Sequence, residues 1–488
     1  MHSIFENKYE VNKEVMMDWG RHPLSKGQQR VQTGFRILWL VFAVFCLFNL
    51  ISAFMAQAGA FVFFYSILLV FCLYRVLWRN KLVIGKQYQI LSKAQGQPSW
   101  ERTIRLDDKI RVYDGNNSSE FQYSQVTGTV EDSRYIALLL GTGQGIRLEK
   151  DAFTMGNAQE LSEFVRHQKF LYAEDTVRET VVIDGETYEF AQNIRGDEKI
   201  RGSFFELASQ VFGLDFEQWY QNGWWRGAYR PNVLIRDGRV VANVSVNPMV
   251  FVVDGQERHY IQLGTVMTAP EFRKKGLSRY LMERVLGEWR DRCDLIYLFA
   301  NSSVLNFYPR FGFERKTEYA FWRAFPVEET PALGGKREFR NLNMRLESDR
   351  RLLIDKAAAA SPVARLQNWK ETGLLMFYCD GPMAEHIYYS DKRDMVLIGK
   401  QEGESLLLYE AFAGNDVNDT AIWKAAQALA GEIGSGQIRN LRTAFAPLCA
   451  DGFLTKACRD DDEALFVMGE DAGMFDGERL EFPEMSRA

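Results

Sequence analysis

The sequence predicts an α+β multidomain protein with four parts: a two-helix transmembrane hairpin, a small β-domain, a mixed α/β lobe and a second α/β lobe. Three observations lead to this prediction. The chain has 488 residues, more than a single hydrophobic core usually organises. Residues 37–74 contain no Asp, Glu, Lys or Arg. After residue 190, strand-like and helix-like patterns follow one another, as expected for mixed α/β lobes.

Composition and charge exclude several classes of function. Hydrophobic residues make up 47% of the chain and charged residues 25%, as in ordinary folded proteins. The net charge of -5, without a basic tail, gives no drive toward nucleic acid. The 6 cysteines are scattered, with no C-x-x-C pair and no histidines at ligand spacing. We therefore expect no nucleic-acid partner, no metal site and no disulfide framework.

The uncharged segment is long enough for two membrane helices, since one crossing takes about 20 apolar residues. The small residues "AQAGA" divide it into spans 37–55 and 60–78. A buried helical hairpin of a soluble protein is the alternative, but neither span has a polar face. A cleaved signal peptide is a further alternative, since "AQA" at 56–58 imitates a cleavage site. The long polar region before it and the second apolar run after it argue against cleavage.

The flanking charges predict the orientation of the hairpin. Lysines and arginines lie at the outer ends of both spans and the connecting turn is uncharged. Lys26, Arg30 and Arg36 precede the first span, Arg75 lies near the end of the second, and Arg79, Lys81 and Lys86 follow it. Positive flanks stay in the cytoplasm. We therefore expect a protein of the cell (inner) membrane, anchored through residues 37–78, with both termini and all soluble domains cytoplasmic.

Residues 81–172 predict a small β-domain. Short β-like runs such as "KLVIGKQYQIL" and "ERTIRLDDKIRVYD" are separated by turn signals, and Asn157 with Glu160 forms a capping-box pattern before a closing helix. With the N-terminal segment 1–80, this part resembles the YcxB-like family: a strand–helix segment, a membrane pair and a pleckstrin-homology-like sheet capped by one helix. The resemblance implies no chemistry. It favours a scaffold or protein-docking module over a ligand-binding one.

A polar connector, "AEDTVRETVVIDGETYEFAQN", leads into the lobe of residues 190–326. We expect a helix at "SFFELASQVF", a hairpin turned at Asp237-Gly238, and a strand at "RHYIQLGTVMTAP". A basic glycine turn follows that strand and opens the helix "LSRYLMERVLGEWRDR", after which "CDLIYLFA" is a buried strand. Such a turn presents backbone N–H groups at a helix N-terminus, which suits a phosphate or pyrophosphate.

The turn has neither the Walker nor the G-x-G-x-x-G spacing. It resembles the pyrophosphate loop of the GNAT N-acetyltransferase superfamily, Arg/Gln-x-x-Gly-x-Gly/Ala. The matching residues here are Arg273, Lys274, Lys275, Gly276, Leu277 and Ser278. The family has Gly or Ala at the last position of this loop, and this chain has Ser278, whose side chain is the larger one where a ligand would approach closely. "FANSSVLNFYPRFGF" resembles a later motif of the same family through Asn301, Tyr308, Gly312 and Phe313.

The resemblance implies acetyl-CoA as co-substrate and direct transfer to a small-molecule amine in a ternary complex. The pantetheine arm would bind main-chain groups of Val266 and Met267 between two strands that part. Tyr308 would protonate the departing thiolate, since a phenol with a pKa near 10 is protonated at neutral pH. A core tyrosine is the alternative for Tyr308, and an ordinary turn residue is the alternative for Asn301.

The acceptor side is less defined. Asp215, Glu217 and His259 are candidate bases, although each fits a solvated surface group better. The stretch 215–231 is rich in aromatic residues. Two interpretations fit its aromatic residues Trp219, Tyr220, Trp224 and Trp225. They line a pocket that binds an amine through cation–π attraction, or they pack in the core, and core packing is the favoured interpretation.

A loop with two prolines and paired glycines, "PVEETPALGGK", precedes the last part, 337–488. This part resembles the second lobe of two-lobed GNAT proteins, in a degenerate and catalytically silent form. Its "GEIGSG" imitates a phosphate loop but follows a helix, so we interpret it as a helix C-cap. The alternative to an enzyme is a noncatalytic membrane-tethered adaptor, or a CoA sensor, that uses the same fold.

Overall fold

The structure is a computed structural model that describes residues 5–20, 22, 26–77, 79–107, 109–141, 144–172, 177–326, 337–368, 372–414, 417–434, 437–458 and 460–487. It divides into two compact units, Met1–Ala173 and Glu174–Ala488, which are described separately. The loop at 327–336 and the start of the connector at 173–176 lie outside the described residues.

Two long apolar helices occupy the predicted spans. α2 runs over Lys26–Met55 and α3 over Gly59–Leu77, so α2 begins earlier than the span 37–55 and Trp78 lies outside the described residues. The helices share the buried residues Ala43, Cys46 and Cys72, while large apolar side chains line their outer surfaces. Phe48, for example, is 70% exposed. Both helices are long and apolar enough to cross a membrane.

One predicted strand of the first unit is wrong. The run "KLVIGKQYQIL" lies within helix α4 (Arg79–Gln95), which packs against α1 (Lys13–Trp19) and α3. Its shielded side chains, Ile84, Tyr88, Ser92 and Gln95, recur every three or four residues, which is the helical period. Val83, Ile90 and Leu91 are exposed instead. Apolar residues therefore lie on both the shielded and the exposed side of α4, so the sequence pattern did not indicate a helix.

The β-domain of this unit contains two sheets. A five-stranded sheet has the order β4-β3-β2-β1-β8, and a three-stranded sheet has the order β5-β6-β7. The strands are β1 (Phe5–Val11), β2 (Trp100–Leu106), β3 (Ile110–Asp114), β4 (Asn117–Phe121), β5 (Val126–Glu131), β6 (Tyr135–Leu140), β7 (Gly145–Glu149) and β8 (Phe153–Met155). β1 pairs with β2 across the whole helical hairpin in sequence. The likeness to a pleckstrin-homology domain stays a prediction.

The helix that closes the β-domain is α5 (Ala158–Tyr172). Asn157 Oδ1 accepts a hydrogen bond of 3.0 Å from the Glu160 N–H, which is the predicted N-cap contact. The buried side chains of Leu161, Phe164 and Val165 hold the helix to the domain. The cap and the apolar face together explain why the helix begins where the sequence predicts.

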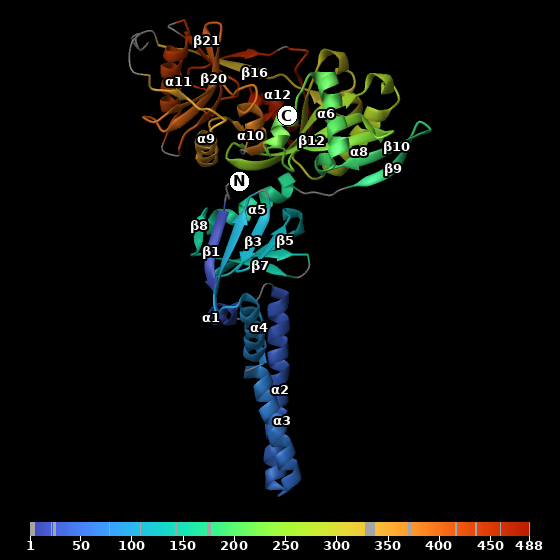
Figure 1. Ribbon diagram of the computed structural model, residues 1–488, viewed down its shortest axis with the longest axis vertical. Helices are drawn as coiled ribbons and strands as arrows, with labels where there is room; N and C mark the ends of the chain where they lie inside the picture. The colour runs from blue at the N-terminus through green and yellow to red at the C-terminus, as the bar shows by residue number, and fades with distance from the viewer. Residues whose placement is uncertain are drawn as a thin grey trace. The chain divides into compact units, whose positions relative to one another are not determined.

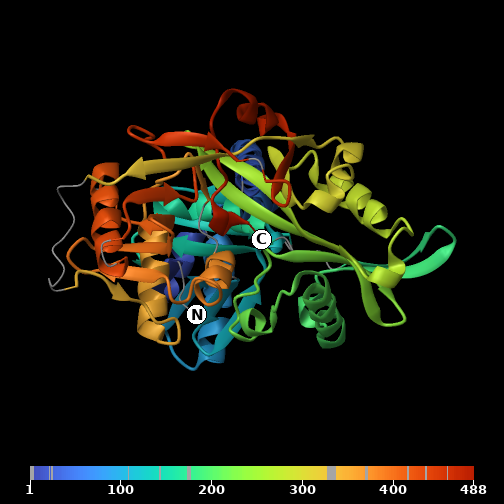
Figure 2. The same ribbon diagram turned by 90° about the horizontal axis from the view of Figure 1, so that it is seen from above.

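The second unit is built on a mixed sheet with the order β15-β24-β14-β13-β12-β11-β10-β9. Its strands are β9 (Arg178–Ile183), β10 (Glu186–Gln192), β11 (Arg230–Arg236), β12 (Arg239–Val253), β13 (Gln256–Thr268), β14 (Leu295–Ala300), β15 (Glu314–Arg315) and β24 (Ala464–Gly469). Helices α6 (Glu198–Phe212) and α8 (Leu277–Trp289) cover opposite faces (Figure 2). The polar connector is corrected here, because β9 and β10 form a hairpin at the sheet edge.

A second sheet of this unit has the order β17-β19-β20-β21-β22-β16-β23. Figure 1 labels its strands β16, β20 and β21. Its strands are β16 (Tyr319–Ala324), β17 (Arg340–Asn341), β19 (Ile387–Ser390), β20 (Met395–Glu402), β21 (Ser405–Phe412), β22 (Asn440–Thr443) and β23 (Leu454–Ala457). The two sheets exchange strands. β24 and β18 (Leu366–Asn368) join the first sheet, whereas β16 joins the second. Folding of either sheet therefore requires chain from both sides of residues 327–336.

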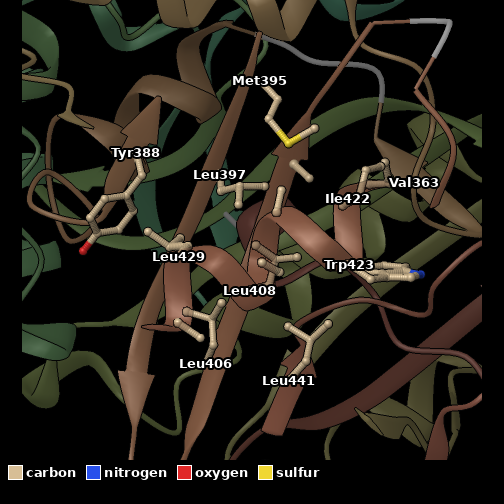
Figure 3. Packing of buried hydrophobic residues seen from close by; sticks show 14 of the residues in the cluster. Val363, Tyr388, Met395, Leu397, Leu406, Leu408, Ile422, Trp423, Leu429 and Leu441 are labelled. Atoms are coloured by element: carbon tan, nitrogen blue, oxygen red, sulfur yellow. The ribbon is translucent and has the colours of Figure 1, made fainter. Parts of the chain in front are cut away.

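The core of the second sheet lies beneath α11 (Asp419–Ile433) (Figure 3). Leu397, Leu406 and Leu408 from the strands meet Ile422 and Leu429 from the helix, and all five are at most 2% exposed. Helices α9 (Glu347–Ala359), α10 (Thr372–Cys379) and α12 (Met474–Gly477) complete this part.

The "GEIGSG" segment lies at the end of α11, as predicted for a helix C-cap. The N–H of Gly434 donates to the Ala430 carbonyl at 3.0 Å, a bond that closes the last helical turn. Residues 435–436 lie outside the described part of the chain. The segment follows the helix rather than opening one, so it does not present the N–H groups of a helix start.

Candidate active site

The central feature of the first sheet is a parting of two parallel strands. β13 and β14 pair only from Tyr260↔Leu295 to Gln262↔Tyr297. Both strands continue beyond this point, β13 to Thr268 and β14 to Ala300, and no ladder pair joins these ends among the described residues. Unpaired main-chain groups on facing strand ends can hydrogen-bond an extended ligand.

A bulge lies on β13 at the same level. Asn243 pairs with Met267 and Ser245 with Gly264, so Thr265 and Val266 together oppose Val244. Thr265 has φ 43°, in the left-handed region. The Met267 side chain is buried among residues of α6 and β11, and the residue pairs with Asn243 of β12. The predicted pair Val266 and Met267 therefore lies where the two strands separate.

The basic turn follows β13 after Ala269 and the short 3₁₀ helix Pro270–Phe272. Lys274 and Gly276 have φ 64° and 74°, and Gly276 is the N-cap of α8. Arg273 and Lys274 are exposed and Leu277 is buried at 2%. The first N–H groups of a helix have no partner within the helix, so this turn can receive an anion. Gly276 permits the left-handed cap without a steric penalty.

Ser278 has a structural explanation. Its hydroxyl lies 2.7 Å from the hydroxyl of Thr268, the last residue of β13. The hydrogen bond ties the end of the strand to the first turn of the helix. The departure from the expected Gly or Ala is therefore a side chain that closes the turn, with its oxygen engaged by the protein itself.

Two carboxylates of the β9–β10 hairpin lie at this turn. Asp184 Oδ2 is 3.1 Å from the point where a Cβ on Gly276 would lie. Glu186 is 3.4 Å from Lys275 Nζ and 3.3 Å from the Arg236 guanidinium. The Tyr188 hydroxyl and Lys275 lower the pKa of Glu186 by hydrogen bonding, so the carboxylate is held ionised. This segment is the one expected to be a connector, although its Asp184-Gly185 pair is a hairpin signal.

Tyr308 follows β14 and begins a short 3₁₀ helix, Tyr308–Phe311. It is 5% exposed, and its ring contacts Phe466 of β24 at a centroid distance of 5.7 Å. Burial raises the pKa of Tyr308 to about 12, above the ordinary value assumed from sequence. Asn301 follows β14, and its side chain accepts the Ser303 N–H at 3.1 Å to cap another 3₁₀ turn. Both predicted residues thus lie in the segment after β14, whose last residues pair with β24.

The aromatic stretch is mostly core. Trp219 and Trp225 are 8% and 2% exposed and stack at 6.0 Å, next to Tyr229. Tyr220 and Trp224 are half-buried, and Tyr220 lies under the Arg201 guanidinium at 3.9 Å. The arrangement agrees with the favoured interpretation of core packing on the α6 face of the sheet.

The three candidate bases have different surroundings. Asp215 and Glu217 are exposed, and the Asp215 carboxylate accepts the Glu217 N–H at 2.9 Å. The His259 ring lies next to the Glu257 carboxylate, and the backbone N–H of His259 donates to the Asp294 carboxylate at 2.7 Å. It precedes Thr265 by about 20 Å of extended strand. None of the three is placed as a base by this geometry.

Comparisons with known proteins assign two segments to families. Residues 195–315 match the family model described as "Acetyltransferase (GNAT) domain". Residues 106–165 match that of "YcxB-like protein". No curated protein matches the chain.

Solved structures give distant likenesses to the same class. A probable N-acyltransferase from Enterococcus faecalis is 16% identical, with 62% of this chain and 74% of that chain covered at a TM-score of 0.40. A GCN5-related N-acetyltransferase from Kribbella flavida is 18% identical, with 57% of this chain and 71% of that chain covered at a TM-score of 0.38. Another from Anabaena variabilis is 14% identical, with 58% of this chain and 73% of that chain covered at a TM-score of 0.38. These likenesses are too distant to add to the argument.

Proposed function

We propose that this chain, an acyltransferase whose residues 195–315 form a GNAT acetyltransferase domain and whose residues 106–165 form a YcxB-like domain, transfers the acetyl group of acetyl-CoA to a small amine. One observation carries the proposal. Beyond the parting of β13 and β14, β13 leads through the short 3₁₀ helix Pro270–Phe272 into a basic turn that opens α8 through a left-handed glycine.

The residues of the turn suit the pyrophosphate of the co-substrate. Arg273, Lys274 and Lys275 supply positive charge, and the main chain of Gly276, Leu277 and Ser278 supplies N–H donors at the start of a helix. Val266 and Met267 offer main-chain partners for the pantetheine arm, which would extend between the strand ends. Asn301 is a further residue that would bind the co-substrate. Holding thioester and amine in register is the main source of rate in such a site.

The proposed chemistry is a direct transfer. The neutral amine nitrogen attacks the thioester carbonyl carbon, the C–N bond forms, and the C–S bond breaks. Tyr308 donates its hydroxyl proton to the thiolate and regains one from water, while water takes the surplus proton of the amine. No protein base is assigned, because Asp215, Glu217 and His259 have no placement that favours the role.

The proposed location is the inner face of the cell membrane. Helices α2 and α3 suggest membrane association, and the positive flanks predicted from sequence place both termini in the cytoplasm. The YcxB-like domain would then act as a docking module beside the membrane, for a protein partner. The part 337–488 would serve as a silent lobe that completes the fold of the catalytic one.

The experiment is calorimetric binding of CoA to the full-length protein in detergent micelles, with a Gly276→Asp variant. The new carboxylate would face the pyrophosphate, and we expect affinity to fall by at least about tenfold, which corresponds to roughly 1.4 kcal/mol. Gly255→Asp is the control for the backbone strain of a side chain at positive φ. Gly255 also has positive φ, lies in the β12–β13 turn and has no heavy atom within 4 Å of an added Cβ.

The outcomes separate the alternatives. Binding that Gly276→Asp loses and Gly255→Asp keeps supports the proposal, and a screen of small amines then measures turnover. Binding without turnover on any amine favours a CoA sensor. No binding by the wild type overturns the enzyme assignment and leaves a membrane-tethered adaptor.

A further inference from the structure

The bulge on β13 holds a residue in an unusual conformation. Thr265 has φ 43°. A β-branched residue in the left-handed region is sterically unfavourable, and bulges of this kind normally have glycine at that position. The conformation persists only if surrounding contacts hold it. The question is which contacts do so, and what the strained turn provides.

The Thr265 hydroxyl is the centre of a polar cluster on the α6 face of the sheet. Thr265 Oγ1 lies 2.8 Å from the Tyr229 hydroxyl, 2.7 Å from the Ser245 hydroxyl and 3.2 Å from Asn243 Nδ2. Asn243 and Ser245 are fully buried, at 0% exposure, on neighbouring inward positions of β12. A glycine at 265 would relieve the backbone but lose all three contacts.

Asn243 also binds the backbone of the strained residue. Its Nδ2 donates to the Thr265 carbonyl at 2.8 Å and to Ser245 Oγ at 2.9 Å. The amide orientation follows from these contacts, because only the NH₂ group can donate to a carbonyl. Asn243 thus holds Thr265 at both its side chain and its main chain.

The rest of the cluster is anchored to the aromatic core. The Tyr229 hydroxyl lies 3.1 Å from Ser245 Oγ, and the Tyr229 carbonyl accepts the Trp225 indole N–H at 3.0 Å. Trp225 is 2% exposed. The cluster therefore has a rigid support and does not depend on solvent.

We infer that Asn243 is a positioning residue for the co-substrate. It holds Thr265 in the left-handed turn, and this turn sets the direction of the main-chain groups of Val266 and Met267 at the parting of β13 and β14. The inference rests on the proposed function, since it takes these groups as the partners of pantetheine. Without Asn243 the backbone at 265 relaxes toward negative φ, the bulge changes shape, and the N–H and C=O groups at 266 turn away.

The test is a rescue experiment on the full-length protein in detergent micelles, with Kd for CoA as the readout. Asn243→Ala should weaken CoA binding by about tenfold. Thr265→Gly should bind within about threefold of the wild type, because glycine adopts positive φ without steric cost. The double variant should bind within about threefold of Thr265→Gly, since the glycine no longer needs the clamp.

Asn247→Ala is the matched control. Asn247 lies four residues further along β12, is 4% exposed, and pairs with Gln262 where the ladder is regular. Its loss should leave Kd unchanged within about twofold. If Asn243→Ala does not give folded protein by thermal unfolding, Ser245→Ala deletes the three contacts of the Ser245 hydroxyl in the same cluster and is compared in the threonine and glycine backgrounds in the same way.

The outcomes are distinct from those of the proposed function. Wild-type protein that binds no CoA overturns the proposed function. The inference alone is overturned if the wild type binds CoA and Asn243→Ala either leaves the affinity unchanged or lowers it by the same factor in the threonine and glycine backgrounds. Weakening in the threonine background that largely disappears in the glycine background supports it, because a general loss of packing would not be cured by a glycine at 265.

Discussion

Glu481 offers a quantitative test of how the C-terminal segment joins the two sheets. The residue is 2% exposed, and its Oε1 lies 3.2 Å from the Arg442 guanidinium. Burial raises the pKa of Glu481 to about 8, while Arg442 acts in the opposite direction and the carboxylate of Glu318 adds to the rise. Arg487 and Glu484 are the other charged groups that face it. Substitution by glutamine preserves the shape and removes the titration.

The sign follows from proton linkage. The folded state holds this proton up to about pH 8, whereas an unfolded glutamate releases it near pH 4.5. The stabilising contribution is therefore complete below pH 4.5 and lost as pH rises through 8. Between pH 6 and 9 the free energy of unfolding of the wild type should fall by about 3 kcal/mol, because it falls by about 1.4 kcal/mol per pH unit up to about pH 8 and little above it. For a unit of roughly 300 residues that corresponds to a fall of about 5 °C in the melting temperature.

The assay is thermal unfolding of the full-length protein in detergent at pH 6, 7.5 and 9. The Glu481→Gln variant should show a melting temperature that falls by about 5 °C less than that of the wild type over this range. Glu463→Gln is the control, since Glu463 belongs to the same cluster through Arg487 but its side chain is 65% exposed. Equal pH dependence in wild type and Glu481→Gln would refute the reasoning.

Two further predictions concern the candidate active site. The double variant Asp184→Asn with Glu186→Gln should tighten CoA binding by about twofold to fivefold at low salt, because it removes two negative charges beside the basic turn. The gain in affinity should shrink as salt rises. Glu179→Gln, on the same hairpin, is the control, and unchanged affinity in the double variant would contradict the idea. Tyr308→Phe should lower kcat by about 100-fold with little change in KM if the hydroxyl protonates the thiolate. Since burial raises the pKa of Tyr308 to about 12, wild-type kcat should show no decline from its ionisation below about pH 11, and a phenylalanine variant of normal rate would exclude the role.

Much of the local structure was predictable because its causes are local. The uncharged run became α2 and α3, Asp237-Gly238 turned the β11–β12 hairpin, and the Asn157 cap started α5. Helix periodicity failed in α4, where exposed apolar residues obscured the buried face. The polar connector failed for a related reason: β9 and β10 have a half-exposed pattern that becomes a hairpin only at the edge of a sheet.

The sequence by itself determined the apolar hairpin, the order of elements from β11 to β14 and the basic glycine turn, since charge, periodicity and turn chemistry act within a few residues. Tertiary structure alone decided that β24 enters the first sheet and β16 the second, because strand pairing joins residues far apart in the chain. It alone brought Asp184 to Gly276 and Asn243 to a strained Thr265. In each case the partner is selected by sheet register, which depends on the packing of the whole unit rather than on any segment of it.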